Sequence, residues 1–144
     1  MKKPITCLLM LLFLSSLALL RAEDLSEDFA YKLAVIHTQT ADPENALLSE
    51  TVAPSEAVVT EFHWIMETLK NRCLNPETAI ADTIIATWQK AKKIGYNKSL
   101  LELSRELSIT ARNYKLFGEE KVNFRMTSSY WLKQLADRTK TKTP

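Results

Sequence analysis

Residues 75–102 read NPETAIADTIIATWQKAKKIGYNKSLLE and contain one complete helix together with the signals for its start and its end. Asn75 can cap free backbone N–H groups, and Pro76 fits the first turn of a helix. Apolar residues then recur every three or four positions, at Ile80, Ile84, Trp88 and Ala91. Two lysines, an isoleucine and Gly95 follow, which is typical of a helix end. The stretch therefore predicts an amphipathic helix between Pro76 and Gly95.

Helical spacing also marks the segments on both sides. The upstream helix is expected to begin at Pro54 or Ser55. Its apolar face is formed by Val58, Phe62, Ile65, Met66, Leu69 and Cys73. Downstream, Ser99 and Glu102 have the spacing of a capping box, whose side chains satisfy free N–H groups at the start of a helix. The face that follows this box is formed by Leu100, Leu103, Leu107, Ala111 and Tyr114. The sequence thus predicts three consecutive amphipathic helices.

The remaining segments give weaker patterns. A short helix is predicted over about residues 25–38, on the spacing of Leu25, Phe29, Leu33 and Ile36. Residues 122–126 alternate and could be extended, but one isolated strand has no partner to complete a sheet. Thr127 or Ser128 could cap a last helix that carries Trp131, Leu132 and Leu135. Residues 139–144 have nothing to bury, so we expect a disordered tail.

The glycines agree with a helical protein. The chain has two, Gly95 and Gly118, and both fall where helices should end. We therefore expect an all-α fold, a small bundle of four to five helices in a domain over residues 55–138. A short helix and an acidic linker over residues 23–54 precede this domain.

Residues 1–22 have the pattern of a secretory signal peptide. A positive start is followed by an almost wholly apolar run over residues 5–20, and then by Arg21 and Ala22. This arrangement predicts cleavage after Ala22 and a secreted or periplasmic mature protein. The alternative is an uncleaved membrane anchor, although the run is shorter than the ~20 residues that span a bilayer. Contact with a membrane is expected only through such an uncleaved segment.

Composition excludes several classes of protein. The 144 residues carry a net charge of +2, with 46% hydrophobic and 25% charged residues, which is typical of a globular domain. Two histidines and two cysteines are too few for a conventional zinc finger or disulfide framework. Removal of the signal peptide leaves Cys73, which we expect to be buried because it lies on an apolar stripe. The alternative for this thiol is an intermolecular bridge.

No catalytic, cofactor or metal site is predicted. His63 and Glu67 share a helix face, but a second histidine at metal-binding spacing is missing. A nucleophilic Cys73 would need a histidine beside it, and ten residues of helix separate it from His63 by about 15 Å. Only His37 could serve that role.

Charge divides unevenly along the chain. Residues 23–82 carry twelve acidic and three basic side chains, a net charge of −9, whereas residues 83–144 carry thirteen basic and five acidic, a net charge of +8. One interpretation is that the two halves face and complement each other in the fold. The other is that the basic half binds an anionic partner such as nucleic acid, phospholipid head groups or an envelope polymer.

Residues 102–117, ELSRELSITARNYKLF, resemble a helix-turn-helix motif. The resemblance implies that a second helix enters the major groove, where Arg112 and Asn113 could contact base edges. Ser108 stands where the motif usually has a turn glycine, and one continuous helix over residues 99–117 is the alternative. A signal peptide also argues against access to cellular DNA.

The sequence therefore predicts an exported, non-enzymatic binding protein with an unknown protein or an anionic envelope component as its partner. The expected contacts with an anionic partner are Arg112, Asn113, Lys115, Lys121 and Arg125. The alternative is a nucleic-acid-binding protein that uses the helix-turn-helix-like segment over residues 103–117. A small hydrolase is a third hypothesis, without a recognisable site.

Overall fold

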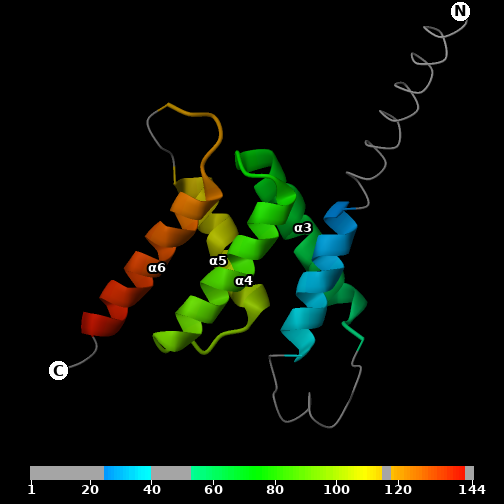
Figure 1. Ribbon diagram of the computed structural model, residues 1–144, viewed down its shortest axis with the longest axis horizontal. Helices are drawn as coiled ribbons and strands as arrows, with labels where there is room; N and C mark the ends of the chain where they lie inside the picture. The colour runs from blue at the N-terminus through cyan, green and yellow to red at the C-terminus, as the bar shows by residue number, and fades with distance from the viewer. Residues whose placement is uncertain (1–24, 40–52, 115–117, 142–144) are drawn as a thin grey trace, which may run out of the picture.

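The computed structural model describes residues 25–39, 53–114 and 118–141. They form five packed helices, so the predicted all-α fold is confirmed (Figure 1). The helices are an N-terminal helix over residues 25–39, α3 (Glu56–Arg72), α4 (Glu77–Lys93), α5 (Leu100–Asn113) and α6 (Phe124–Thr141). The signal peptide, most of the acidic linker and Lys115 lie outside the described residues. Within the described ranges, no helix is both long and apolar enough to cross a bilayer.

Two of the three consecutive helices begin at a serine cap. The Ser55 hydroxyl accepts a hydrogen bond from the Val58 amide at 3.3 Å, and the Ser99 hydroxyl accepts one from the Glu102 amide at 3.2 Å. These caps satisfy amide groups that a first helical turn leaves free. The helix end predicted at Gly95 is also confirmed, since this glycine has a φ of 99°, in the left-handed region.

The predicted cap of α4 is wrong. Pro76 occupies the N-cap position of this helix, and no side chain caps it. Asn75 instead accepts a hydrogen bond at Oδ1 from the Phe124 amide at 2.6 Å, which holds the start of α6 against the α3–α4 connection. The asparagine therefore serves a distant helix rather than the one that follows it.

The last helix begins earlier than predicted. Its first residue is Phe124 rather than a residue after Thr127, because the Asn123 side chain accepts from the Met126 amide at 3.3 Å. The expected extended stretch over 122–126 is reduced to Val122, which forms an isolated parallel bridge with Cys73. At its other end α6 continues through Thr141, so it includes the first three residues of the expected disordered tail.

The core lies where the apolar stripes meet. α3 packs against α5, and α4 packs against α6. The largest fully buried side chains include Phe62, Leu69, Ile84, Leu103, Leu107 and Phe124. Cys73 is 3% exposed, as its stripe predicted, and the N-terminal helix adds Ala30, Leu33 and Ala34 to the same cluster.

Candidate functional site

A groove separates the N-terminal helix from α3. It encloses a cavity of about 440 Å³, lined by Glu27, Ala30, Tyr31, Val59, Thr60 and His63. The cavity exists because small side chains, Ala30 and Thr60 among them, stand where the two helices face each other. Its volume lies within the range of ligand pockets in proteins. We call this feature the N-terminal groove.

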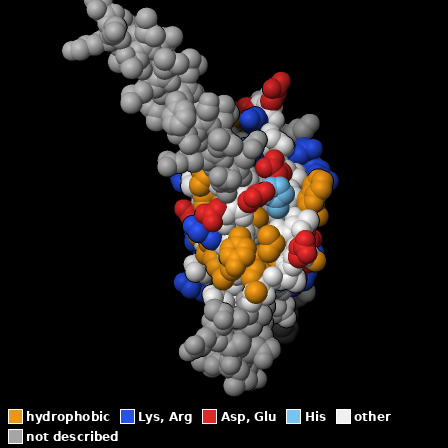
Figure 2. All heavy atoms as spheres, turned by 90° about the vertical axis from the view of Figure 1, so that its right-hand side faces the viewer, with side chains coloured by type: hydrophobic (Ala, Val, Ile, Leu, Met, Phe, Trp, Pro, Cys, Tyr) orange, Lys and Arg blue, Asp and Glu red, His pale blue; other side chains and the backbone are white. Residues whose placement is uncertain are grey.

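Exposed aromatic side chains lie on the two helices that form this groove. Tyr31, which lines the cavity, is 53% exposed, and Trp64, which follows His63 on α3, is 68% exposed. Leu25 on the N-terminal helix is exposed as well. Figure 2 shows hydrophobic side chains gathered on this face, with acidic side chains around them. Tryptophan and tyrosine are the residues most enriched at the energetic centres of protein interfaces.

Polar groups in the groove are few. Glu27 supplies the carboxylate of the lining, and the Nδ1 atom of His63 is enclosed without a hydrogen-bond partner among the described residues. A buried polar atom without a partner costs about 1–3 kcal/mol. A bound group or ordered water that reached this nitrogen would recover part of that cost.

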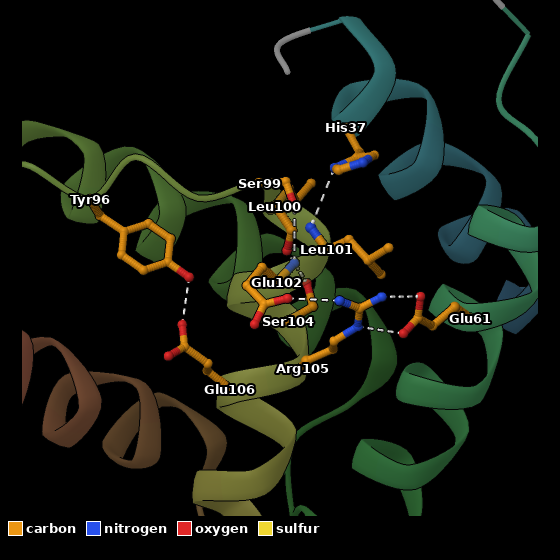
Figure 3. Close-up of polar contacts among 10 residues, drawn as sticks. All are labelled: His37, Glu61, Tyr96, Ser99, Leu100, Leu101, Glu102, Ser104, Arg105 and Glu106. Carbon is orange, nitrogen blue, oxygen red and sulfur yellow. Dashed lines mark hydrogen bonds and ion pairs between the residues drawn. The ribbon is translucent and has the colours of Figure 1, made fainter. Parts of the chain in front are cut away.

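Two polar contacts fix the ends of the N-terminal helix. Near its start, the Ser26 hydroxyl donates to Glu77 Oε1 at 2.9 Å, so the helix is tied to the beginning of α4. Near its end, the Leu101 amide donates to His37 Nδ1 at 3.4 Å, which ties the helix to the first turn of α5 (Figure 3). The wall of the groove is therefore held in place from both ends.

Burial, followed by the charge of Arg105, lowers the pKa of His37 from its usual value, while Glu61 acts in the opposite sense. The neutral imidazole can accept the Leu101 hydrogen bond at Nδ1, whereas the doubly protonated ring cannot. His37 also contacts Phe62 edge-on, with the ring centroids 6.0 Å apart.

Arg105 links α5 to α3 beside this contact. Its guanidinium forms a two-pronged ion pair with Glu61, in which the NH2–Oε2 distance is 2.8 Å, and also bonds Glu102 at 2.7 Å (Figure 3). The hydrogen bond from Arg105 lowers the pKa of Glu61. This ion pair joins the acidic half of the chain to the basic half, in keeping with the first interpretation of the charge asymmetry. Because these side chains are well exposed, we expect the pair to orient the helices more than to stabilise them.

The helix-turn-helix interpretation is contradicted by the geometry of α5. Residues 103–113 belong to one uninterrupted helix, so the turn that the motif requires at Ser108 is missing from it. Ser108 is buried in the middle of this helix. Without a turn, Arg112 and Asn113 occupy the last turn of a helix rather than the N-terminal part of a recognition helix.

The residues expected to contact an anion do not form one site. Arg112, Lys121 and Arg125 are exposed near the same end of the bundle, but acidic Glu119 and Glu120 lie in the same connection. Asn113 lines a hollow between α5 and α6, together with Tyr114 and Tyr130, whose rings stack at 5.0 Å. Arg125 lines a different hollow, between α4 and α6. Lys115 is outside the described residues.

Neither a metal centre nor a reactive cysteine emerges from the described residues. They contain no group of three or more histidine, cysteine, aspartate or glutamate side chains that could hold a metal ion. Burial raises the pKa of Cys73 to about 11, which is the opposite of what an attacking thiolate needs.

Sequence reasoning missed the N-terminal groove, although one signal for it was present. Trp64 and Tyr31 are large aromatic residues that lie outside the apolar stripes of their helices. A tryptophan on the polar face of an amphipathic helix indicates a contact surface rather than a core position. Comparison with known proteins adds no assignment: no protein family, curated protein or solved structure matches this chain.

Proposed function

We propose that this chain is an exported, non-enzymatic binding protein whose N-terminal groove holds an amphipathic segment of a partner protein. The observation that carries the proposal is the 440 Å³ cavity between the N-terminal helix and α3, which the exposed ring of Tyr31 lines. A mostly apolar cavity with a few polar groups is the usual form of a binding site.

Charge indicates the kind of segment that the groove receives. Glu27 lines the cavity, Asp28 follows it on the same helix, and Glu56 and Glu67 lie on α3. An apolar anchor flanked by lysine or arginine would bury its hydrophobic side chain and place its cations beside these carboxylates. Such charge complementarity speeds encounter and selects partners.

The way the groove is held also favours binding. The contacts Ser26–Glu77 and His37–Leu101 fix the N-terminal helix at both ends, so a partner would meet a wall that is already ordered. A preorganised surface avoids the entropy that a flexible one loses on association.

Trp64 provides a direct test on the mature protein. Trp88 and Trp131 are buried, so the emission of exposed Trp64 should change selectively when the groove is occupied. The probes are synthetic helical peptides with a phenylalanine or leucine anchor between lysines, and matched peptides with glutamate in place of lysine. We expect a saturable blue shift with the lysine peptides and weaker binding, by about tenfold or more, with the glutamate peptides.

A pair of variants locates the binding. Tyr31→Asp places a charge at the lining of the groove and should lower the affinity by about tenfold. Ile109→Asp is the matched control, because Ile109 is also an exposed hydrophobic residue but lies on α5. No saturable binding of any peptide, or equal losses in the two variants, would contradict the proposed function.

Export rests on residues 1–22 and has a separate test. The mass of the protein recovered from outside the cytoplasm should correspond to a chain that begins at Glu23. A full-length chain in the cytosol would contradict export and leave the groove itself unaffected.

A further inference from the structure

A second hollow lies between α4 and α6, which run side by side (Figure 1). Its volume is about 310 Å³. Small side chains stand on the facing surfaces of the helices, among them Ala79 and Ala86 on α4 and Ser129 on α6. They leave the space open in a seam that larger residues would fill. We call this feature the α4–α6 hollow.

Two cations line the α4–α6 hollow. Lys90 comes from the last turn of α4 and Arg125 from the first turn of α6. Neither forms an ion pair with a carboxylate of the described residues. Of the basic residues near by, Lys92 differs, because its ammonium lies 3.5 Å from the centre of the Trp88 ring. Lys90 and Arg125 therefore line the hollow without a carboxylate partner among the described residues, whereas Lys93, also in the last turn of α4, lies outside the lining.

Arg125 lies in the first turn of α6, where no acidic side chain of the same turn can neutralise its charge. The N-terminal end of a helix carries a partial positive charge, and carboxylates are favoured in its first turn. The first turn of α6 has no acidic residue and carries Arg125 instead. Two amides of this turn, those of Phe124 and Met126, already bond the side chains of Asn75 and Asn123, so Arg125 rather than the end of the helix supplies the charge that a bound anion would neutralise.

The hydroxyl groups that line the hollow determine which hydrogen-bonding groups a ligand needs. Thr83, Thr87 and Ser129 each donate their hydrogen to the carbonyl oxygen one turn earlier in their own helix. Thr87 and Ser128 also bond each other, so Ser128 donates to Thr87. Because these hydrogens are engaged, the wall offers oxygens that accept hydrogen bonds but few that donate. Asp82 adds a carboxylate, which also accepts.

We propose that the α4–α6 hollow binds the phosphate ester of a small polyol, such as glycerol phosphate or a sugar phosphate. The phosphate contacts Arg125 and Lys90, while the hydroxyl groups of the ligand donate to Asp82 and to the accessible oxygens of Thr83 and Ser129. Asp82 repels inorganic phosphate but accepts from a polyol, so the site favours the ester over either half alone. A volume of about 310 Å³ lies at the lower end of the range for ligand pockets and suits such a molecule.

The test is a titration of the mature protein with glycerol 1-phosphate, followed by amide chemical shifts. We expect saturable changes in α4 and α6 around the hollow. Inorganic phosphate should bind about tenfold more weakly, and glycerol should show no saturable binding. Absence of saturable binding by glycerol 1-phosphate, or equal binding of inorganic phosphate, would overturn the proposal.

Charge variants distinguish binding in this hollow from general electrostatic attraction to the basic residues of 83–144. Arg125→Ala and Lys90→Ala should each lower the affinity for glycerol 1-phosphate by about tenfold, since each removes a charge-assisted contact. The matched controls are Arg112→Ala, at the end of α5, and Lys93→Ala, in the last turn of α4 but outside the lining. Equal losses in the controls would show non-specific electrostatics and overturn the proposal.

Substitution of Asp82 separates the effect of charge on phosphate binding from the effect of the hydroxyl groups of the ligand. Asp82→Asn removes a negative charge, so binding of inorganic phosphate should strengthen. The preference for glycerol 1-phosphate over inorganic phosphate should fall, because a strong acceptor for the polyol is lost. An unchanged preference would contradict the role of the polyol hydroxyls.

The phosphate ester could be a free metabolite or the head group of a lipid, and two further arms distinguish these sources. Vesicles of phosphatidylglycerol in phosphatidylcholine present glycerol phosphate on a membrane as a phosphodiester, and vesicles of phosphatidylcholine alone are the control. Binding to the soluble ester alone assigns a free ligand, whereas tighter binding to the anionic vesicles that Arg125→Ala removes assigns a lipid. Binding to vesicles that Arg125→Ala leaves unchanged would overturn the proposal for this hollow.

Discussion

The N-terminal groove and the α4–α6 hollow are both spaces between neighbouring helices, but their chemistry is opposite. The groove has a mostly apolar lining, the exposed ring of Tyr31 and the carboxylate of Glu27. The hollow has a floor of small and hydroxyl side chains and the cations Lys90 and Arg125. In both cases small residues open the space, whereas longer side chains at its edge decide what can enter.

The two helix pairs are also held differently. The N-terminal helix is fixed at its ends by side chains that reach other helices, Ser26 to α4 and His37 to α5. The α4–α6 pair is joined by the buried hydroxyl groups of Thr87, in the second half of α4, and Ser128, in the second turn of α6. From this contrast we expect a substitution in the core to lower the stability of the fold most. A substitution in the buried hydroxyl pair should lower it less, and one at His37 least.

The largest effect is expected at Phe62, which is fully buried on α3 behind the N-terminal groove. Phe62→Ala should lower the free energy of unfolding by about 3–5 kcal/mol, because it removes apolar contacts and leaves a cavity. Urea denaturation measures this loss. Trp64→Ala is the control on the same helix, with an expected change within about 0.5 kcal/mol because the side chain is largely exposed. Similar losses in the two variants would mean that Trp64 belongs to the core and not to the binding surface.

A smaller effect is expected in the seam between α4 and α6. Thr87→Val keeps the shape of the side chain but leaves the buried Ser128 hydroxyl without its partner, at a cost of about 1–3 kcal/mol. The double variant Thr87→Val with Ser128→Ala removes both groups and should recover most of that loss. Urea denaturation of Thr87→Val, Ser128→Ala and the double variant gives the comparison. If the double variant lost more than the sum of the single changes, the hydroxyl pair would not be the contact that joins these helices.

The helices could be predicted from the sequence because their signals are local. The stripe from Ile80 to Ala91, the cap at Ser99 and the stop at Gly95 each depend on residues within one or two turns. Predictions failed where a side chain acts over a long range. Asparagine is a residue type that usually caps the helix that follows it, yet the partner of Asn75 is the amide of Phe124, 49 positions away.

The two candidate sites could not be predicted for the same reason. Tyr31 and His63 meet across a groove, and Lys90 and Arg125 line one hollow, only because the chain folds back on itself. The sequence named Arg125 as a contact for an anion through the charge of its half of the chain, but it could not separate this residue from Arg112. The resemblance at residues 103–117 misled in a related way, since spacing alone does not distinguish two short helices from one long helix.

The smallest expected effect concerns the polar contact that fixes the end of the N-terminal helix, and it depends on pH. Burial and the charge of Arg105 hold the pKa of His37 below its ordinary value of 6.5, against the opposing effect of Glu61. The folded chain therefore resists protonation of this ring more than the unfolded chain does. The contribution of His37 to stability is complete above pH 6.5 and is lost as the pH falls through the lower folded pKa.

This dependence can be isolated with His37→Asn, whose side-chain oxygen can still accept from the Leu101 amide but does not titrate. We expect the thermal midpoint of the native protein to fall more steeply than that of the variant as the pH is lowered from about 7.5 to about 5. A lower protection factor of the Leu101 amide, measured relative to its intrinsic exchange rate at each pH, should accompany the fall, since protonated His37 can no longer accept that N–H. All other side chains are the same in the two proteins, so the difference between the two curves reports on His37. Parallel curves would mean that the His37–Leu101 contact does not hold the end of the N-terminal helix, and that only the Ser26–Glu77 contact and the apolar residues fix this helix.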